Sequence, residues 1–177
     1  IPFDKLLFRE WLQDPTPIEL IGASIGAWRM AALAMPDPVA ALERLQRGYV
    51  RDQNYTAKPT PDDIAAACRR IGRGVLDGQP LRVRPGVSLT IITSRARGPL
   101  AGKESKLAFG RAVLSNTISR DRLAAHLQRV LFTTDATFLA EPFDEFGSCV
   151  VGLTDANCED ALVASGTIPL ICSPVRD

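Results

Sequence analysis

Histidine is almost absent from this sequence, and its few cysteines are far apart. The 177 residues include one histidine, His126, and no two cysteines have the C-x-x-C spacing. Structural zinc sites use four Cys or His ligands that usually come in closely spaced pairs, so we expect no metal site and no cofactor. The cysteines are Cys68, Cys149, Cys158 and Cys172. Because most of them have apolar neighbours, we expect small buried thiols in a reducing compartment.

The sequence also lacks a long apolar run and an excess of charge of either sign. No stretch approaches the ~20 apolar residues of a membrane span, and the chain does not open on a signal-peptide pattern. The 21 basic and 20 acidic residues balance and are scattered, which argues against nucleic acid as a partner. We expect a cytoplasmic protein for which peripheral contact with a lipid surface stays open. Neither the apolar residues nor the charges of the sequence indicate an oligomeric state.

The spacing of apolar residues favours one α/β domain over residues 1–177. Helices and strands alternate along it, which implies a mostly parallel sheet covered on both faces. Strands are predicted over residues 18–21, 87–93 and 149–153, and the apolar residues of the first are typical of a central strand. Helices are predicted over residues 3–13, 25–35, 38–50, 61–76, 105–114, 119–132 and 157–165, with 130–132 left open as the start of a strand.

The first predicted helix is amphipathic and should pack beside the strand that begins at Ile18. Its broad apolar face consists of Phe3, Leu6, Leu7, Trp11 and Leu12. Both tryptophans of the chain, Trp11 and Trp28, fall at helical spacing and are interpreted as core residues. An interfacial contact with lipid is the alternative, because indole rings favour membrane boundaries.

One short stretch, Gly22-Ala-Ser-Ile-Gly26, matches the G-x-S-x-G pattern between a predicted strand and a predicted helix. In that pattern the backbone folds back sharply and holds the serine in a strained conformation. Gly22 and Gly26 are the small neighbours that let strand and helix pass closely. Ser24 is then displayed at a helix N-terminus, where N–H groups and the helix dipole favour negative charge.

Two interpretations of Ser24 stay open on the pattern alone. In the first, Ser24 is a nucleophile at the strand-to-helix turn, called the elbow below. In the second, the stretch is an ordinary glycine-containing turn and Ser24 only caps the helix.

The sequence pattern assigns a catalytic role to no other residue. His126 sits in a helical pattern, whereas the histidine of a Ser-Asp-His triad usually lies on a loop, so it is interpreted as a helix residue. Asp121 and Asp155 look like capping or turn residues, and Asp160 lies within a short amphipathic helix. Asp177 is also available but has no pattern around it.

The elbow, together with Ala164-Ser-Gly-Thr-Ile-Pro169 and the following Pro174-Val175, resembles the patatin-like phospholipases, in particular an uncharacterised bacterial branch. The resemblance spans most of the chain in order. It implies a three-layer α/β/α sandwich and hydrolysis of lipid acyl esters by a serine and an aspartate, without histidine. Ser24 matches the nucleophile, and Gly22 and Gly26 match the elbow glycines.

Two further parts of that family's site have no match here. Its aspartate lies in an Asp-Gly motif soon after the A-S-x-x-I-P turn, and no such motif occurs between Pro169 and Asp177. Asp77-Gly78 lies in another region and is interpreted as a helix stop. The glycine-rich oxyanion loop precedes the first helix in the family, and here no such loop stands before residue 3. We therefore expect a domain that is partial at both ends and, by itself, nearly inactive.

The sequence leaves two candidate functions, which belong to different classes. The whole protein is either a serine hydrolase acting on a lipid or other acyl ester, or a non-catalytic binding or scaffold module that keeps the fold.

Overall fold

The structure, a computed structural model, describes residues 2–12, 17–51, 54–101, 124–138, 147–168 and 171–175. The predicted helix over 105–114 and the first part of that over 119–132 lie outside these residues. The other predicted elements can be compared with the structure, and most of them are present.

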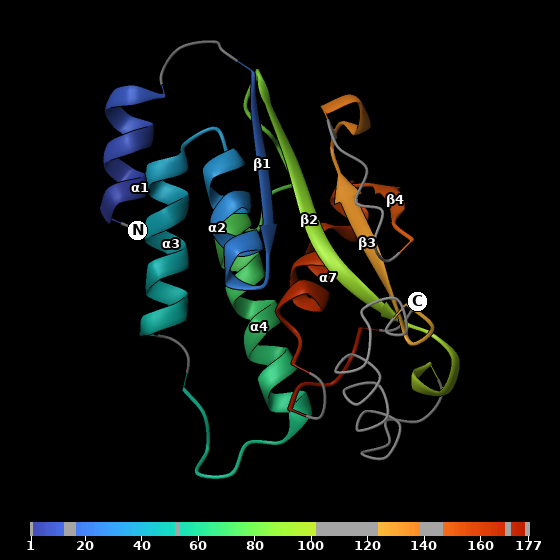
Figure 1. Cartoon of the computed structure of the whole chain (residues 1–177). Helices are drawn as coiled ribbons and strands as arrows, with labels where there is room; N and C mark the ends of the chain where they lie inside the picture. The colour runs from blue at the N-terminus through green and yellow to red at the C-terminus, as the bar shows by residue number, and fades with distance from the viewer. Residues whose placement is uncertain are drawn as a thin grey trace.

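The fold is α/β, as predicted, and is built on a four-stranded, mostly parallel sheet in the order β1-β2-β3-β4 (Figure 1). β1 (Ile18–Ala23) pairs in parallel with β2 (Val87–Ala96). β2 pairs antiparallel with β3 (Leu127–Thr133), and β3 pairs in parallel with β4 (Cys149–Gly152). β1 thus lies at the edge of the sheet that the described strands form, whereas its apolar sequence suggested a central strand.

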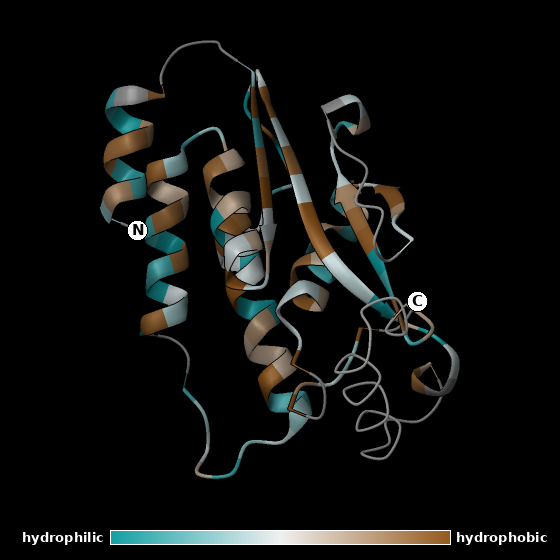
Figure 2. Cartoon of the chain, in the orientation of Figure 1, coloured by the Kyte–Doolittle hydropathy of each residue, from teal (hydrophilic) through white to brown (hydrophobic). Residues whose placement is uncertain are grey.

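Four helices pack together beside the sheet, and the first and last of them contact its strands. They are α2 (Ile25–Ala34), α3 (Pro38–Val50), α4 (Pro61–Leu76) and α7 (Asp155–Gly166). Figure 2 shows apolar and polar residues alternating around these helices, and the apolar side chains meet Leu20, Leu89 and Ile91 of the sheet in the core. This arrangement is consistent with the predicted α/β/α sandwich, of which these helices form one outer layer.

Capping residues set the helix starts where the sequence indicated them. Asp37 accepts a hydrogen bond from the Ala40 N–H at 3.0 Å, and Thr60 and Asp63 form a reciprocal capping box at the start of α4. Asp77 ends α4 in the left-handed conformation, with φ 56°. Asp77-Gly78 is therefore a helix stop, as predicted.

Residues 127–132 form a strand, so the helix predicted over 119–132 is wrong there. The spacing of Leu123, Leu127 and Val130 fits a helix, but Val130 and Leu131 are buried in the sheet, where they pair with Thr93 and Ile92. The partner strand lies more than thirty residues earlier, so local spacing does not reveal this pairing. The strand interpretation of 130–132, left open above, is confirmed.

The first helix buries only part of the face predicted for it. Leu7 and Leu12 pack against the core as predicted, but Phe3 and Leu6 do not. α1 (Pro2–Leu6) continues into a π-helical turn, η1 (Leu7–Trp11), so the angular spacing of its side chains departs from that of a regular α-helix. Phe8 and Asp4 are buried, whereas Phe3 is 71% exposed and Leu6 46%. The helix packs on α3, not beside β1 (Figure 1), and the Arg29 guanidinium of α2 binds both oxygens of Asp4 at 2.6 and 2.8 Å.

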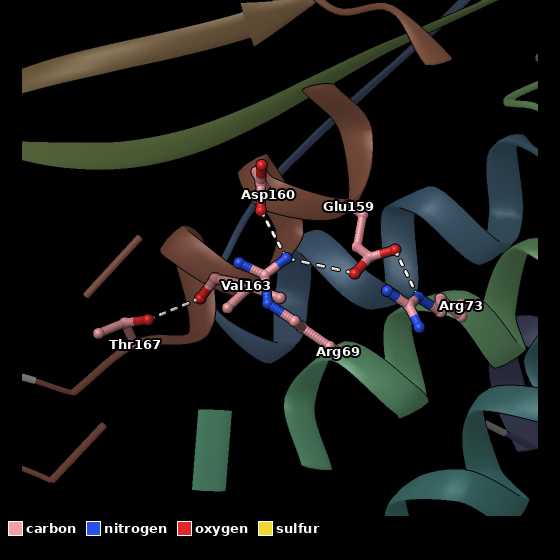
Figure 3. A network of polar contacts seen from close by, with 6 residues as sticks. All are labelled: Arg69, Arg73, Glu159, Asp160, Val163 and Thr167. Carbon is pink, nitrogen blue, oxygen red and sulfur yellow. Dashed lines mark hydrogen bonds and ion pairs between the residues drawn. The ribbon is translucent and has the colours of Figure 1, made fainter. Parts of the chain in front are cut away.

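A network of ion pairs joins α4 to α7 (Figure 3). Arg69 donates to Glu159 at 3.2 Å and to Asp160 at 2.6 Å, and Arg73 donates to Glu159 at 2.7 Å. A hydrogen bond from Arg73, with a smaller contribution from Arg69, lowers the pKa of Glu159 below its ordinary value of 4.5. Partial burial acts in the opposite direction but does not cancel this effect. Charges on these two helices are therefore structural partners and not a binding patch for an anion.

Substituting Glu159→Gln should lower the free energy of unfolding by less than ~1 kcal/mol at pH 7, because the network is largely solvated. A carboxylate whose pKa is lowered in the folded state stabilises that state at pH values above its pKa in the unfolded chain, which is near 4.5. The difference from the parent protein should therefore disappear as the pH falls through the lowered pKa. Urea unfolding at several pH values measures it, with the exposed Glu10→Gln as the control. A difference that persists at low pH would contradict the ionic origin.

Candidate active site

Ser24 lies at the turn between β1 and α2, in a conformation that L-residues rarely adopt. Its φ is 54° and its ψ is −134°, and within the described residues only Asp77 shares a positive φ among non-glycine residues. Such a backbone costs about 1–3 kcal/mol and persists only where the surroundings impose it. The Ser24 side chain is exposed and makes no hydrogen bond to a described residue. The predicted elbow is therefore present, and Ser24 does not act as a side-chain cap of α2.

The two motif glycines are not equivalent, which corrects the prediction that both let strand and helix pass. A Cβ atom on Gly22 would lie 2.6 Å from the Ala27 nitrogen and from the carbonyl carbon and oxygen of Gly26. A Cβ atom on Gly26 would meet nothing within 4 Å. Only Gly22 is required by the close approach of β1 and α2.

Ser165, near the end of α7, holds the elbow from the side. Its hydroxyl accepts a hydrogen bond from the Ser24 N–H at 2.9 Å and donates one to the Ile92 carbonyl of β2 at 2.6 Å. The segment from Ala164 to Pro169 contributes to the family resemblance, but the sequence predicted no role for Ser165. Because 141 residues separate Ser165 from Ser24, no local pattern indicates this contact.

Trp28 fixes the end of α7 against α2. Its side chain is only 4% exposed, and its indole N–H donates to the Leu162 carbonyl at 2.8 Å. A Cβ atom on Gly166 would come within 3.1 Å of the indole ring, so a larger residue after Ser165 would require the ring to shift by a few tenths of an ångström. The core interpretation of Trp28 is confirmed, whereas the Trp11 side chain lies outside what the structure describes.

His126 precedes β3 in a turn, and not inside a helix as predicted. His126 comes directly before Leu127, which pairs with Ala96 of β2. Ser24 comes directly after Ala23, which pairs with Ile92, four residues earlier on β2. Four residues of strand span about 13 Å, and the two sites also lie on different strands. This separation exceeds the reach of a hydrogen bond between the imidazole and the Ser24 hydroxyl.

The carboxylates considered in the sequence have other positions or partners. Asp155 accepts the Leu81 N–H at 3.0 Å, before the start of β2 and thus at the far end of the sheet from Ser24, and Asp160 binds Arg69. Burial raises the pKa of Glu19, but this residue is the second of β1, about 16 Å of strand before Ser24. Asp121 and Asp177 lie outside the described residues. The described part of the chain therefore brings no proton acceptor to Ser24.

The start of α2 offers donors for an anion beside Ser24. The Ser24 carbonyl accepts the N–H groups of Ala27 and Trp28, so the helix ladder begins there. The N–H groups of Ile25 and Gly26 precede that ladder and have no partner within the helix. In G-x-S-x-G sites the N–H after the nucleophile is one of the oxyanion donors, a role that the Ile25 N–H can fill.

Exposed apolar side chains border the Ser24 end of the molecule. Ile25 follows Ser24 and is 40% exposed, and Ile168, three residues after Ser165, is 55% exposed. Tyr49 is also exposed and places its ring edge-on to Trp28, with the ring centroids 6.3 Å apart. Of these three side chains, that of Ile25 belongs to the residue directly after Ser24, so an apolar group bound at Ser24 would lie close to it.

Other kinds of site are not seen in the residues that the structure describes. They contain no group of three or more Cys, His, Asp or Glu side chains placed to hold a metal ion. The four cysteines are free, and burial raises the pKa of Cys158 to about 12, which makes its thiol a poor nucleophile. In the same part of the chain, no helix has the length and apolar character needed to cross a membrane.

Comparison of the chain with protein-family models, with curated protein sequences and with solved structures gave no match. The candidate active site is therefore defined by its own geometry: a strained, exposed Ser24 at a strand-to-helix turn, held by Gly22 and Ser165.

Proposed function

We propose that Ser24 is the nucleophile of a serine acyl hydrolase that acts on lipid esters, in a domain related to the patatin-like phospholipases. The observation that carries the proposal is the strained backbone of Ser24, which presents its exposed hydroxyl at the N-terminus of α2. Strain of this kind is retained where it serves a site, because a relaxed residue would be more stable.

The chemistry follows from the groups around this serine. The Ser24 Oγ attacks the ester carbonyl while its proton passes to a base, which gives a tetrahedral intermediate. The bond to the alcohol oxygen then breaks, the base returns the proton to the departing alcohol, and an acyl-enzyme remains. The Ile25 N–H and the dipole of α2 stabilise the negative charge on the carbonyl oxygen. Water then releases the fatty acid. The resemblance assigns the base to an aspartate of an Asp-Gly motif after the A-S-x-x-I-P turn, and no such motif occurs between Pro169 and Asp177.

The apolar surroundings of Ser24 favour a lipid or other acyl ester over a polar substrate. Ile25 and Ile168 offer contacts to an acyl chain, and a long chain gains about 0.8 kcal/mol for each CH₂ group that it buries. We also propose a cytoplasmic location, since all four cysteines are free, and peripheral contact with the lipid that carries the substrate ester.

Hydrolysis of p-nitrophenyl acetate and octanoate by the full-length protein tests this function. We expect faster hydrolysis of the octanoate, and a loss of at least ~10³-fold in Ser24→Ala, because removing the nucleophile of such a site abolishes covalent catalysis. Ser173→Ala, which removes another hydroxyl on a segment packed against the start of α4, is the control and should keep full activity.

Equal hydrolysis by Ser24→Ala would reject Ser24 as the nucleophile. If no form of the full-length protein hydrolyses either ester, the hydrolase proposal fails and the binding or scaffold module takes its place.

A further inference from the structure

The hydroxyl of Ser165 occupies a position where the pairing of β1 with β2 stops. Ala23 and Ile92 form the last register pair, after which the chain leaves the sheet at Ser24. The Ser24 N–H and the Ile92 carbonyl are then bridged by Ser165, which accepts from the first at 2.9 Å and donates to the second at 2.6 Å. A serine hydroxyl can do both because it is a donor and an acceptor at once.

Ser165 is itself held in place from two sides. The Trp28 indole binds the Leu162 carbonyl and packs against Gly166, and the Thr167 hydroxyl donates to the Val163 carbonyl at 2.8 Å. The ion pairs of Figure 3 join the first half of α7 to α4. The end of α7 is thus a rigid support against which the strained backbone of Ser24 rests.

We propose that Ser165 is a positioning residue for Ser24: its hydroxyl replaces a β1–β2 ladder hydrogen bond and fixes the backbone that aims the Ser24 hydroxyl. This inference rests on the proposed function of Ser24. Ser165 does not touch the reacting atoms. It acts through the Ser24 N–H, and its removal leaves that donor and the Ile92 carbonyl without their bridge.

The rate of labelling of the full-length protein by a fluorophosphonate probe tests the inference. We expect Ser165→Ala to lower the second-order rate constant by about 10- to 100-fold, because a nucleophile displaced by about 1 Å loses up to that factor. Ser165→Thr keeps a hydroxyl and should recover most of the rate. The matched control Ser173→Ala should label like the parent protein.

A second measurement does not depend on reactivity. The Ser24 amide proton signal in a ¹⁵N-resolved NMR spectrum should shift upfield in Ser165→Ala and stay near its parent position in Ser165→Thr, because a hydrogen-bonded amide proton is deshielded. A purely structural role would lower stability without this pattern of loss and rescue.

The outcomes separate the two proposals. If the parent protein labels at Ser24 and folded Ser165→Ala labels at the same rate, the positioning role is overturned while the proposed function stands. If the parent protein does not label, the proposed function fails, and an unchanged Ser24 amide signal in Ser165→Ala would overturn the backbone bridge as well. If Ser165→Ala does not fold, Ser165→Thr decides: an amide shifted upfield with labelling at the parent rate, or a parent-like amide with slow labelling, would overturn the role.

Discussion

Replacing Gly22 by alanine is expected to destabilise the protein by about 3 kcal/mol or more, because the added Cβ would overlap backbone atoms. It would lie 2.6 Å from the Ala27 nitrogen and from two carbonyl atoms of Gly26. Side-chain rotation cannot relieve a contact with backbone, so β1 and α2 would have to separate. Urea unfolding of the full-length protein, followed by circular dichroism, measures the loss.

The matched control is Gly26→Ala, in the same motif and four residues away. A Cβ atom there meets nothing within 4 Å, and alanine is the better helix former, so stability should stay equal or rise by up to ~1 kcal/mol. A Gly22→Ala variant as stable as the parent protein would show that β1 and α2 do not pass as closely as described here.

The second large effect concerns Ser24, for which two substitutions separate chemistry from strain. Both Ser24→Ala and Ser24→Gly remove the hydroxyl and should abolish covalent labelling and ester hydrolysis. Only glycine relieves the backbone, which has φ 54°, so Ser24→Gly should be more stable than Ser24→Ala by about 1–2 kcal/mol.

Thermal and urea unfolding of the two variants side by side provide the comparison. The same stability in both would mean that Ser24 is not strained in solution. A gain in the glycine variant, together with lost reactivity in both, would show that this position holds a costly conformation for the sake of its hydroxyl.

Local patterns were sufficient to predict the elbow and most helices. Asp37 and Thr60 mark helix starts through hydrogen bonds to residues three positions later, and such signals are readable from the sequence. The turn at Ser24 is likewise local, since glycine at position 22 and the change from strand to helix composition both lie within a few residues.

Long-range contacts explain what local patterns missed. β3 has helical spacing but is a strand because it pairs with β2, and the edge position of β1 depends on the whole sheet. The face predicted for the first helix was wrong at Phe3 and Leu6, since a π-helical turn alters the spacing and Arg29 holds Asp4 in a buried position. The contact of Ser165 with Ser24 joins residues 141 positions apart, which no periodicity encodes.

The resemblance to patatin-like phospholipases implied two elbow glycines, and the geometry gives a reason for only one of them. The strained serine and the close approach at Gly22 have a physical reason in the structure, whereas Gly26 meets no neighbour that excludes a side chain. A role for Gly26 would therefore lie in leaving room for a substrate, which predicts that Gly26→Ala slows ester hydrolysis without lowering stability.

Whether the Ser24 hydroxyl is a reactive nucleophile is best measured by treating the full-length protein with a fluorophosphonate and mapping the adduct by mass spectrometry of its peptides. We predict one phosphonyl group, formed with loss of fluoride, on the peptide that contains Ser24, and no adduct in Ser24→Ala. An adduct on another residue, or labelling that persists in Ser24→Ala, would contradict the assignment.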